Sequence, residues 1–399
     1  MVTYNFDQII ERSNTNSIKW EYYHDFIPAA PADALPLWVA DMDFPCAEPI
    51  VRALQQRIDC QIFGYSSYRT DQYLQAVTGW FKRRFDWEIE SSSIFYSPGI
   101  VTAVAVLIKI LTKPGEGILI QRPVYYPFTD KIEANNRVII NNPLQYTNGK
   151  YSVDFADLER KIADENTKGM ILCSPHNPVG LVFSVDELLK IVEICRKYNK
   201  WIVADEIHAD LVRKDVTHYP LEKIASHYKE QIITCTSPSK TFNMPGLKIS
   251  NIIINNPHYQ QAWLHEVNDC LSIGMANPLS IKAVEAAYGE GEEWLNQLKT
   301  YLDQNIEFAA AFIQDNLPKA KLIYPAGTYL LWIDLRAYCS DHQVLENLML
   351  TEAKLILDQG YFFGEEGRGF ERINAACPRS ILEECLQRMT KALHSAKQV

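Results

Sequence analysis

Six short apolar runs, separated by segments with helical patterns, constrain most strongly how this chain can fold. They are residues 118–120, 138–140, 170–173, 201–204, 232–235 and 252–254. Each run is continuously apolar rather than alternating, which is typical of strands covered on both faces, as in parallel sheets. Between two of them, Ser184 and Glu187 form a capping box, followed by Leu188 and other apolar residues at helical spacing. This order predicts an α/β domain with a doubly wound, mostly parallel sheet.

The pattern changes after about residue 278. A long helical stretch passes through Ala283, Trp294 and Phe308, and two candidate strands follow it, at residues 329–335 and 370–375. A chain of 399 residues is long for one domain and comfortable for two. We therefore expect an N-terminal segment beside the small domain and the site entrance, a large domain, and a small α+β domain. Their expected bounds are residues 1–45, 46–280 and 281–399.

Charge and cysteine content exclude several kinds of partner. The net charge of -10 argues against nucleic acid, and the densest basic cluster is only residues 82–84. The nine cysteines are scattered without a CxxC pair, which indicates reduced thiols and a cytoplasmic setting rather than disulfides or a metal site. Residues 1–12 lack the apolar core of a signal peptide, and the longest apolar stretch, residues 100–111, is too short to span a bilayer. We expect no metal, no membrane and no nucleic acid.

Lys240 stands in a serine-rich turn directly after the run that ends at Cys235. Burial behind a strand favours the neutral amine, and a neutral amine attacks aldehydes. A surface lysine in a polar turn is the alternative. Asp205, at the end of another apolar run, favours the chemical interpretation. Pyridoxal phosphate (PLP) needs both groups, because a lysine holds its aldehyde and a carboxylate keeps its ring nitrogen protonated.

Three turns offer further groups, and two of them follow candidate strands, where ligands bind at the carboxyl ends of parallel strands. Residues 97–102 form a glycine-containing turn that opens a helix, where free backbone N–H groups hold a phosphate. Residues 122–127 place aromatic rings where a planar cofactor stacks, and residues 174–180 offer the amide of Asn177. Each turn also has an ordinary interpretation, as a simple glycine turn, as core aromatics, or as an Asn-Pro turn.

Five motifs in this order resemble the fold-type-I PLP enzymes, the aspartate-aminotransferase superfamily, and more closely their MalY/PatB branch of cystathionine β-lyases, or C–S lyases. The motifs are WVADMDFP (38–45), SPHNPVG (174–180), ADEIHADL (204–211), SPSKTFNMPGLK (237–248) and RINAACPR (372–379). The resemblance covers essentially the whole chain. It implies an aspartate-aminotransferase-like fold with PLP bound in the large domain.

The resemblance also implies roles for individual residues that hold the cofactor. Lys240 would bind the PLP aldehyde as a Schiff base and then transfer protons, Asp205 would pair with the pyridinium nitrogen, and Asn177 would bond the 3-oxygen. Tyr125 would stack on the ring. The remaining implied cofactor contacts are the backbone amides of Ile100 and Val101, the hydroxyl of Ser237, and His208.

Substrate and subunit contacts are implied in the same way. Arg372, with Asn177 and Ala40 beside it, would bind the substrate α-carboxylate. In a strand, Phe370, Arg372 and Asn374 share one face, which agrees with that role, although a surface arginine is the alternative. Tyr65, counted with Lys240 and Asp205 among the catalytic residues, would reach the phosphate in a neighbouring subunit, so the family implies a homodimer.

Some positions depart from the wider superfamily or have two interpretations. His208 stands where many aminotransferases carry Tyr, which fits the C–S lyase branch, and a structural histidine is the alternative. Lys248 stands where many aminotransferases have a phosphate-binding Arg. A lysine keeps the positive charge but lacks the guanidinium group that forms two parallel hydrogen bonds to a phosphate. Asp41 is a candidate for the substrate entrance, and Asp43 is expected to cap the following helix. Tyr126, Tyr329 and Phe363 are candidate lining residues.

The activity that the resemblance implies is α,β-elimination from L-cystathionine, L-cysteine or other cysteine S-conjugates, with release of a thiol, pyruvate and ammonia. An aminotransferase is the main alternative, because lysine, aspartate and ring serve both reactions. A lyase with a second role in binding a regulatory protein is a third possibility.

Overall fold

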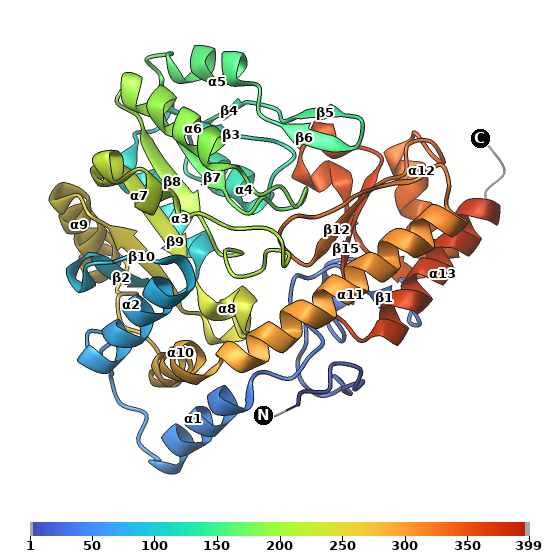
Figure 1. Ribbon diagram of the computed structural model, residues 1–399, viewed down its shortest axis with the longest axis horizontal. Helices are drawn as coiled ribbons and strands as arrows, with labels where there is room; N and C mark the ends of the chain where they lie inside the picture. Colours follow the sequence, from blue (N-terminus) through green and yellow to red (C-terminus); the bar gives the residue numbers. More distant parts are fainter. Residues whose placement is uncertain (1–2, 396–399) are drawn as a thin grey trace.

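A computed structural model describes residues 3–395 and shows a seven-stranded sheet at the centre of the large domain (Figure 1). The strands lie in the order β2-β10-β9-β8-β7-β3-β4. Their bounds are β2 (Ile94–Ser97), β3 (Gly117–Ile120), β4 (Val138–Asn141), β7 (Thr167–Cys173), β8 (Trp201–Asp205), β9 (Ile232–Thr236) and β10 (Ser250–Ile254). All six predicted apolar runs are strands of this sheet. The sheet is parallel from β9 to β4, and β10 alone runs antiparallel to both of its neighbours.

Helices cover both faces of this sheet, as the continuous apolar runs predict. On one face, α3, α4 and α9 enclose a core that includes Val104, Phe128 and Trp263. On the other, α5, α6 and α7 enclose a core that includes Leu158 and Ile191. The bounds are α3 (Ile100–Leu111), α4 (Pro127–Ala134), α5 (Phe155–Ile162), α6 (Val185–Lys197), α7 (Leu221–Ile224) and α9 (Pro257–Leu264). The predicted capping box of Ser184 and Glu187 is present at the start of α6.

A third group of helices packs beside β2 and β10. It consists of α1 (Glu48–Asp59), α2 (Asp71–Phe85), α8 (Pro238–Thr241) and α10 (Pro278–Glu290). The helical stretch expected after residue 278 is two helices, because α10 ends at Glu290 and α11 (Glu292–Asn316) begins after the single residue Gly291. Figure 1 shows α11 running from this group toward the C-terminal elements. Its first half lies in the core of the large domain, and its second half, from Ile306, in the core beside the small sheet.

The small domain is built on an antiparallel sheet of order β11-β12-β15-β14. Its elements are β11 (Lys321–Ile323), β12 (Leu330–Asp334), β14 (Asp358–Gln359), β15 (Phe370–Asn374), α12 (His342–Asn347) and α13 (Arg379–Ser395). The N-terminal segment joins it, because β1 (Leu35–Pro36) pairs with β13 (Leu355–Ile356). A hairpin of β5 (Gln145–Thr147) and β6 (Lys150–Ser152) completes the strands of the described residues. The domain bounds given above stay a prediction.

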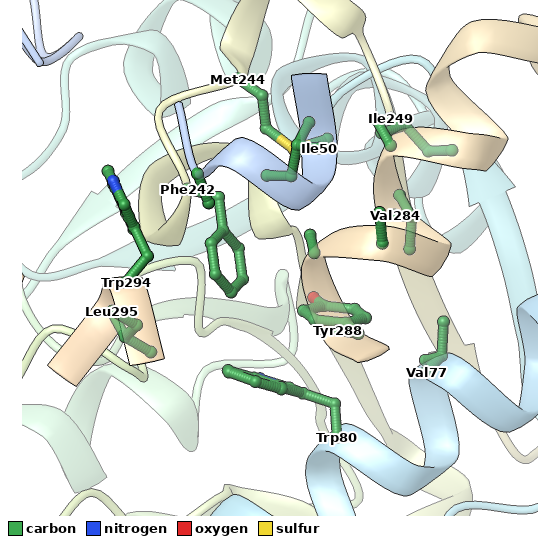
Figure 2. Close-up of a cluster of buried hydrophobic side chains, with 14 of the residues drawn as sticks. Ile50, Val77, Trp80, Phe242, Met244, Ile249, Val284, Tyr288, Trp294 and Leu295 are labelled. Atoms are coloured by element: carbon green, nitrogen blue, oxygen red, sulfur yellow. The ribbon is translucent and has the colours of Figure 1, made fainter. Parts of the chain in front are cut away.

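Phe242, two residues after Lys240, anchors the turn that carries this lysine. Its ring is fully buried, and its centroid lies 5.5 Å from Trp80, 6.3 Å from Tyr288 and 6.0 Å from Trp294. Figure 2 shows the Phe242 ring between Trp294 and Tyr288, pointing toward Trp80. Across residues 3–395, every helix is too short or too polar to cross a lipid bilayer.

Replacing Phe242 with Ala is expected to lower the free energy of unfolding by about 3–5 kcal/mol, because a buried ring is removed from a well-packed cluster. Urea unfolding followed by circular dichroism measures this loss. Tyr22→Ala, at an aromatic residue that is 46% exposed, is the control and is expected to cost less than about 1 kcal/mol. Equal losses in the two variants would contradict the anchoring role of Phe242.

Candidate active site

Lys240 projects from α8, the short helix that follows β9, into the edge of the sheet where the parallel strands end. Its Nζ donates a hydrogen bond to the carbonyl oxygen of Ala40 at 2.6 Å. Burial lowers the pKa of Lys240 to about 8, although the Asp41 carboxylate acts in the opposite direction. The amine is therefore much closer to its neutral, nucleophilic form at neutral pH than an exposed lysine is.

The lysine turn is held by its own hydroxyl groups and by a buried carboxylate. Ser237 caps α8, because its Oγ accepts from the backbone N–H of Ser239 at 3.1 Å and donates to the carbonyl of Ile249 at 2.7 Å. Thr241 Oγ1 donates to Asp210 Oδ2 at 3.0 Å. These bonds fix the backbone on both sides of Lys240, so the direction of the amine is set by the fold.

Asp205 is the last residue of β8, next to β9 in the sheet. Its side chain is 3% exposed, and its Oδ1 accepts from the backbone N–H of Ile207 at 3.1 Å. Burial raises the pKa of Asp205 to about 7, and the opposing effect of the Lys240 charge is smaller. A cationic N–H group that entered the site would stabilise the charged form of this buried carboxylate.

A cavity of about 210 Å³ separates these two side chains. It brings together most of the predicted site residues, and its other walls come from the segments beside them. The predicted residues in its lining are Ala40, Ile100, Val101, Tyr125, Asn177, Asp205, His208 and Lys240, joined by Lys248. Since β7, β8 and β9 are neighbours, their ends place Asn177, Asp205 and Lys240 around one space.

The N-terminus of α3 forms one end of the cavity. Gly99 stands at the cap with a φ of 135°, and no side chain of the described residues 3–395 caps the helix. The backbone amides of Ile100, Val101 and Thr102 therefore remain available to an anion, favoured further by the helix dipole. Lys248 also lines this cavity and adds a positive charge.

Arg372 lies on β15 and reaches the same region from the small domain. Its Nη1 donates to Asn177 Oδ1 at 3.0 Å, and its Nη2 donates to the carbonyl of Trp38 at 3.0 Å and to the carboxylate of Asp358. Burial lowers the pKa of Arg372 to about 10. Its Nε is buried without a partner among residues 3–395. The guanidinium is thus placed between the two domains, with part of its fork already engaged by Asp358.

The WVADMDFP segment crosses the site and is tied to both domains. Asn374 Nδ2 donates to the carbonyls of Val39 and Asp41, and Asn243 Nδ2 donates to those of Met42 and Phe44. This segment, residues 38–45, is called the strap below. It places the Ala40 carbonyl against Lys240 and against the hydroxyl of Tyr329, which donates to it at 2.8 Å.

The expected capping role of Asp43 is wrong. Helix α1 begins at Glu48 with Ala47 as its cap, so Asp43 lies too far upstream. Its carboxylate instead accepts from Lys19 Nζ at 2.7 Å, from Arg12 at 3.2 Å and from the indole of Trp20 at 2.8 Å. Lys19 is fully buried and also lies 3.7 Å from Asp41, so the two carboxylates neutralise its charge.

Three predicted contacts do not line the cavity within one chain. Arg372 reaches it only through its hydrogen bond to Asn177. Tyr65 lies in the loop between α1 and α2 and is 96% exposed. Ser237 is buried, and its hydroxyl is engaged by Ser239 and Ile249 rather than lining the cavity. Of the candidate lining residues, Tyr126 borders a second cavity, and Phe363 lies under the guanidinium of Arg372 at 4.9 Å.

The site's chemistry fits PLP on four observations. Asp205 is a buried carboxylate whose pKa burial raises, which suits a protonated ring nitrogen as partner. His208 Nδ1 is buried and has no hydrogen-bond partner among residues 3–395, so it is available to a polar group in the cavity. The uncapped N-terminus of α3 suits a phosphate. Lys240 faces the same space with a lowered pKa.

Comparison with known proteins agrees with this arrangement. Residues 32–389 match the family described as Aminotransferase class I and II. The chain belongs to this family. It is 40% identical to cystathionine beta-lyase PatB of Bacillus subtilis, over 98% of this chain and 100% of PatB. It is 34% identical to protein MalY of Escherichia coli, over 99% of this chain and 100% of MalY.

A solved structure agrees with these two matches. Cystalysin from Treponema denticola, which contains a PLP cofactor, superimposes with a TM-score of 0.95 and 38% identity over 99% of this chain and 100% of cystalysin. The predicted aspartate-aminotransferase-like fold and the predicted MalY/PatB branch are therefore confirmed.

Asp358 is the main residue of the site that was not predicted from the sequence. It follows the apolar residues Leu355, Ile356 and Leu357, so it ends an apolar run in the way that Asp205 does. That pattern could have identified it. The pairing with Arg372 could not be found in this way, because β14 and β15 are joined by a loop of unpredictable shape. Cys173, Ile207 and Ser250 also line the cavity without any distinguishing sequence signal.

The stability of the cofactor-free protein is expected to depend on pH through Lys240. Its folded pKa of about 8 lies below the 10.5 of an ordinary lysine, so the charged amine destabilises the folded state below pH 8. The penalty fades as the pH rises from 8 to 10.5. Lys240→Met is therefore expected to stabilise this protein near pH 7 by about 2 kcal/mol, allowing for partial solvent screening.

Urea unfolding of both proteins between pH 6.5 and 10.5 measures this difference. Lys248→Met, at an exposed lysine of the same cavity, is the control for removing a lysine that is not buried, and it is measured over the same pH range. A Lys240→Met advantage that stays constant up to pH 10.5 would show that burial does not depress the pKa of Lys240.

Proposed function

We propose that this protein is a PLP-dependent carbon–sulfur β-lyase that releases a thiol, pyruvate and ammonia from L-cystathionine or other L-cysteine S-conjugates. The observation that carries the proposal is the 40% identity to cystathionine beta-lyase PatB over the full length of both chains. The site supports it, because Lys240 and Asp205 face each other across one cavity beside Arg372.

Separate residues of this chain bind the cofactor and the substrate. Asp205 provides the anionic partner for a protonated ring nitrogen, and the α3 amides with Lys248 hold the phosphate. Asn177 Oδ1 accepts from Arg372 Nη1, and its Nδ2 has no acceptor among residues 3–395, so this N–H group is available to a ring oxygen. Arg372 binds the substrate α-carboxylate. Bound PLP supplies the electron sink that stabilises negative charge at the substrate α-carbon.

Lys240 moves the proton that starts the elimination. Its amine takes the α-hydrogen, the electron pair passes toward Cβ, and the Cβ–S bond breaks with the thiolate as leaving group. Hydrolysis of the remaining three-carbon unit gives pyruvate and ammonia, so one water is consumed for each thiol released. The lowered pKa of Lys240 suits this role, because a base works best with a pKa near the operating pH.

The active unit is a homodimer in which Tyr65 reaches the phosphate of the partner's site. Support comes from the loop that carries it, where Ile62, Phe63 and Tyr65 are 73%, 60% and 96% exposed. Large apolar side chains exposed together mark a surface that another molecule covers. Mixing Lys240→Ala and Tyr65→Ala subunits is expected to restore about a quarter of wild-type activity, since half of the dimers then have one intact site. No recovery on subunit exchange would remove the shared-site arrangement.

We place this enzyme in the cytoplasm.

One assay tests the function. The holoenzyme is incubated with L-cystathionine while pyruvate and free thiol are followed, and a parallel reaction contains an amino acid with 2-oxoglutarate. Equal amounts of pyruvate and thiol are expected. Glutamate as the dominant product would identify an aminotransferase instead, and a bound cofactor without any turnover would favour a binding role.

A further inference from the structure

A second and larger cavity, of about 520 Å³, lies between the N-terminal segment, α4 and the small domain. Aromatic and aliphatic side chains form most of its wall. They are Phe26, Ile27, Trp38, Tyr126, Leu350 and Phe362, together with residues of the strand β13. Phe26 is 59% exposed and Phe362 is 46% exposed, so apolar surface at this wall faces solvent. Such surface suits an apolar group larger than water.

This cavity borders the substrate end of the proposed active site. Trp38 and Asp358 both line it, and both accept hydrogen bonds from Arg372 Nη2. Tyr126 also lines it and directly follows Tyr125, which lines the cofactor cavity. Arg372 therefore stands between the two cavities, so a substrate held by its α-carboxylate at Arg372 has both within reach.

Among residues 3–395, the charged side chains that line the larger cavity have one sign. They are the three carboxylates of Asp130, Glu346 and Asp358, and no lysine, arginine or histidine of the described residues lines it. Asp358 is neutralised by Arg372, which leaves Asp130 and Glu346. Asp130 is exposed at the rim, and Glu346 accepts a hydrogen bond from Tyr361 at 3.0 Å. A cation is favoured here and an anion is repelled.

A polar group in the wall also lacks a partner. The indole Nε1 of Trp38 is buried and has no hydrogen-bond acceptor among residues 3–395. An unpaired buried N–H is costly unless a ligand or water supplies an acceptor. The wall therefore offers apolar surface, one free donor and two carboxylates.

We infer that this cavity receives the thiol half of the substrate and selects cysteine S-conjugates whose substituent is apolar or cationic over those whose substituent is anionic. The inference rests on the proposed lyase function and names its substrate class. Bound PLP would fill the cofactor cavity of about 210 Å³ with its ring and phosphate, so a bulky S-substituent needs separate space. The larger cavity supplies that space next to the carboxylate-binding arginine.

Three substrates of similar length separate charge from size. They are S-(2-aminoethyl)-L-cysteine, S-propyl-L-cysteine and S-carboxymethyl-L-cysteine, each assayed with the holoenzyme for kcat/KM of pyruvate release. Their thiols differ as leaving groups, so the informative quantity is the ratio between a variant and the wild type for each substrate. The double variant Glu346→Gln/Asp130→Asn is expected to lower the aminoethyl-to-carboxymethyl preference about tenfold and to leave the propyl substrate nearly unchanged.

Glu352→Gln is the matched control, because Glu352 is an exposed carboxylate of the same segment outside the cavity. It is expected to leave all three ratios unchanged. The PLP-loaded Lys240→Ala protein, which cannot turn over, gives a binding readout by calorimetry, and tighter binding of the aminoethyl than of the carboxymethyl compound is expected.

The size of the cavity is tested separately. Leu350→Trp fills the wall and is expected to lower kcat/KM for S-benzyl-L-cysteine at least about tenfold while sparing L-cysteine, which has no S-substituent. Equal effects on both substrates, or a double variant with an unchanged charge preference, would overturn the inference while the lyase function stands. Absence of thiol release from every substrate would overturn the proposed function itself.

Discussion

Replacing Lys240 with Ala will abolish elimination, with a loss of about 10⁴-fold or more in kcat, because the variant lacks both the amine that bonds the cofactor and the base that takes the α-proton. The structure gives the physical reason. Lys240 is the lysine that faces Asp205 across the cavity, and burial brings its pKa down to about 8. Pyruvate formation from L-cystathionine measures the activity, and visible absorbance of the dialysed protein measures the covalent link to PLP.

Lys240→Arg and Lys248→Gln are the matched variants for this test. The arginine keeps a positive charge but remains protonated at neutral pH, so it is expected to be as inactive as the alanine variant. Lys248→Gln removes a charge from the phosphate end of the same cavity and is expected to weaken PLP binding with little effect on kcat at saturating cofactor. Substantial activity in either Lys240 variant would remove the proposed mechanism. Among residues 3–395, the one other lysine that lines this cavity is Lys248, to which the mechanism gives no role in proton transfer.

The sequence predicted the part of the site that depends on strand order. Apolar runs end at Cys173, Ala204 and Cys235, and the chemically active residues come within about five positions after these ends. In a doubly wound sheet, neighbouring parallel strands bring such positions to one edge, so Asn177, Asp205 and Lys240 meet without any knowledge of side-chain packing. The same rule explains why the turn at Gly99 also lies there, although the strand before it, β2, was not recognised.

The parts that depend on tertiary packing between distant segments could not be predicted in this way. Asp43 was expected to cap α1, but Lys19 and Arg12 approach it from a segment without regular secondary structure. The strap that presents the Ala40 carbonyl is held by Asn243 and Asn374, which lie about 200 and 330 residues later in the chain. Local patterns carry no information on such contacts. Tyr65 is a further case, because its proposed target lies in another subunit.

Replacing Asp205 with Asn will lower kcat/KM for elimination about a thousandfold, the second largest effect expected. The amide keeps the size of the side chain and can still accept from the N–H of Ile207, so the fold is preserved. It cannot neutralise a protonated ring nitrogen in a buried site, and removing one partner of a buried ion pair costs about 3–5 kcal/mol. Steady-state kinetics with L-cystathionine and the affinity for PLP measure the two consequences.

Glu206→Gln is the control for this variant, because Glu206 is the adjacent carboxylate and is equally buried. It faces away from the cavity, where it pairs with His218 at 3.1 Å and accepts from the N–H of Leu221 at 2.8 Å. Glutamine keeps an acceptor for Leu221, so elimination is expected to change less than about tenfold. The contrast between two neighbouring carboxylates isolates the effect of charge at the ring nitrogen. If Asp205→Asn were as active as Glu206→Gln, the carboxylate of Asp205 would be structural, and the electron sink would have to be maintained by another residue of the cavity.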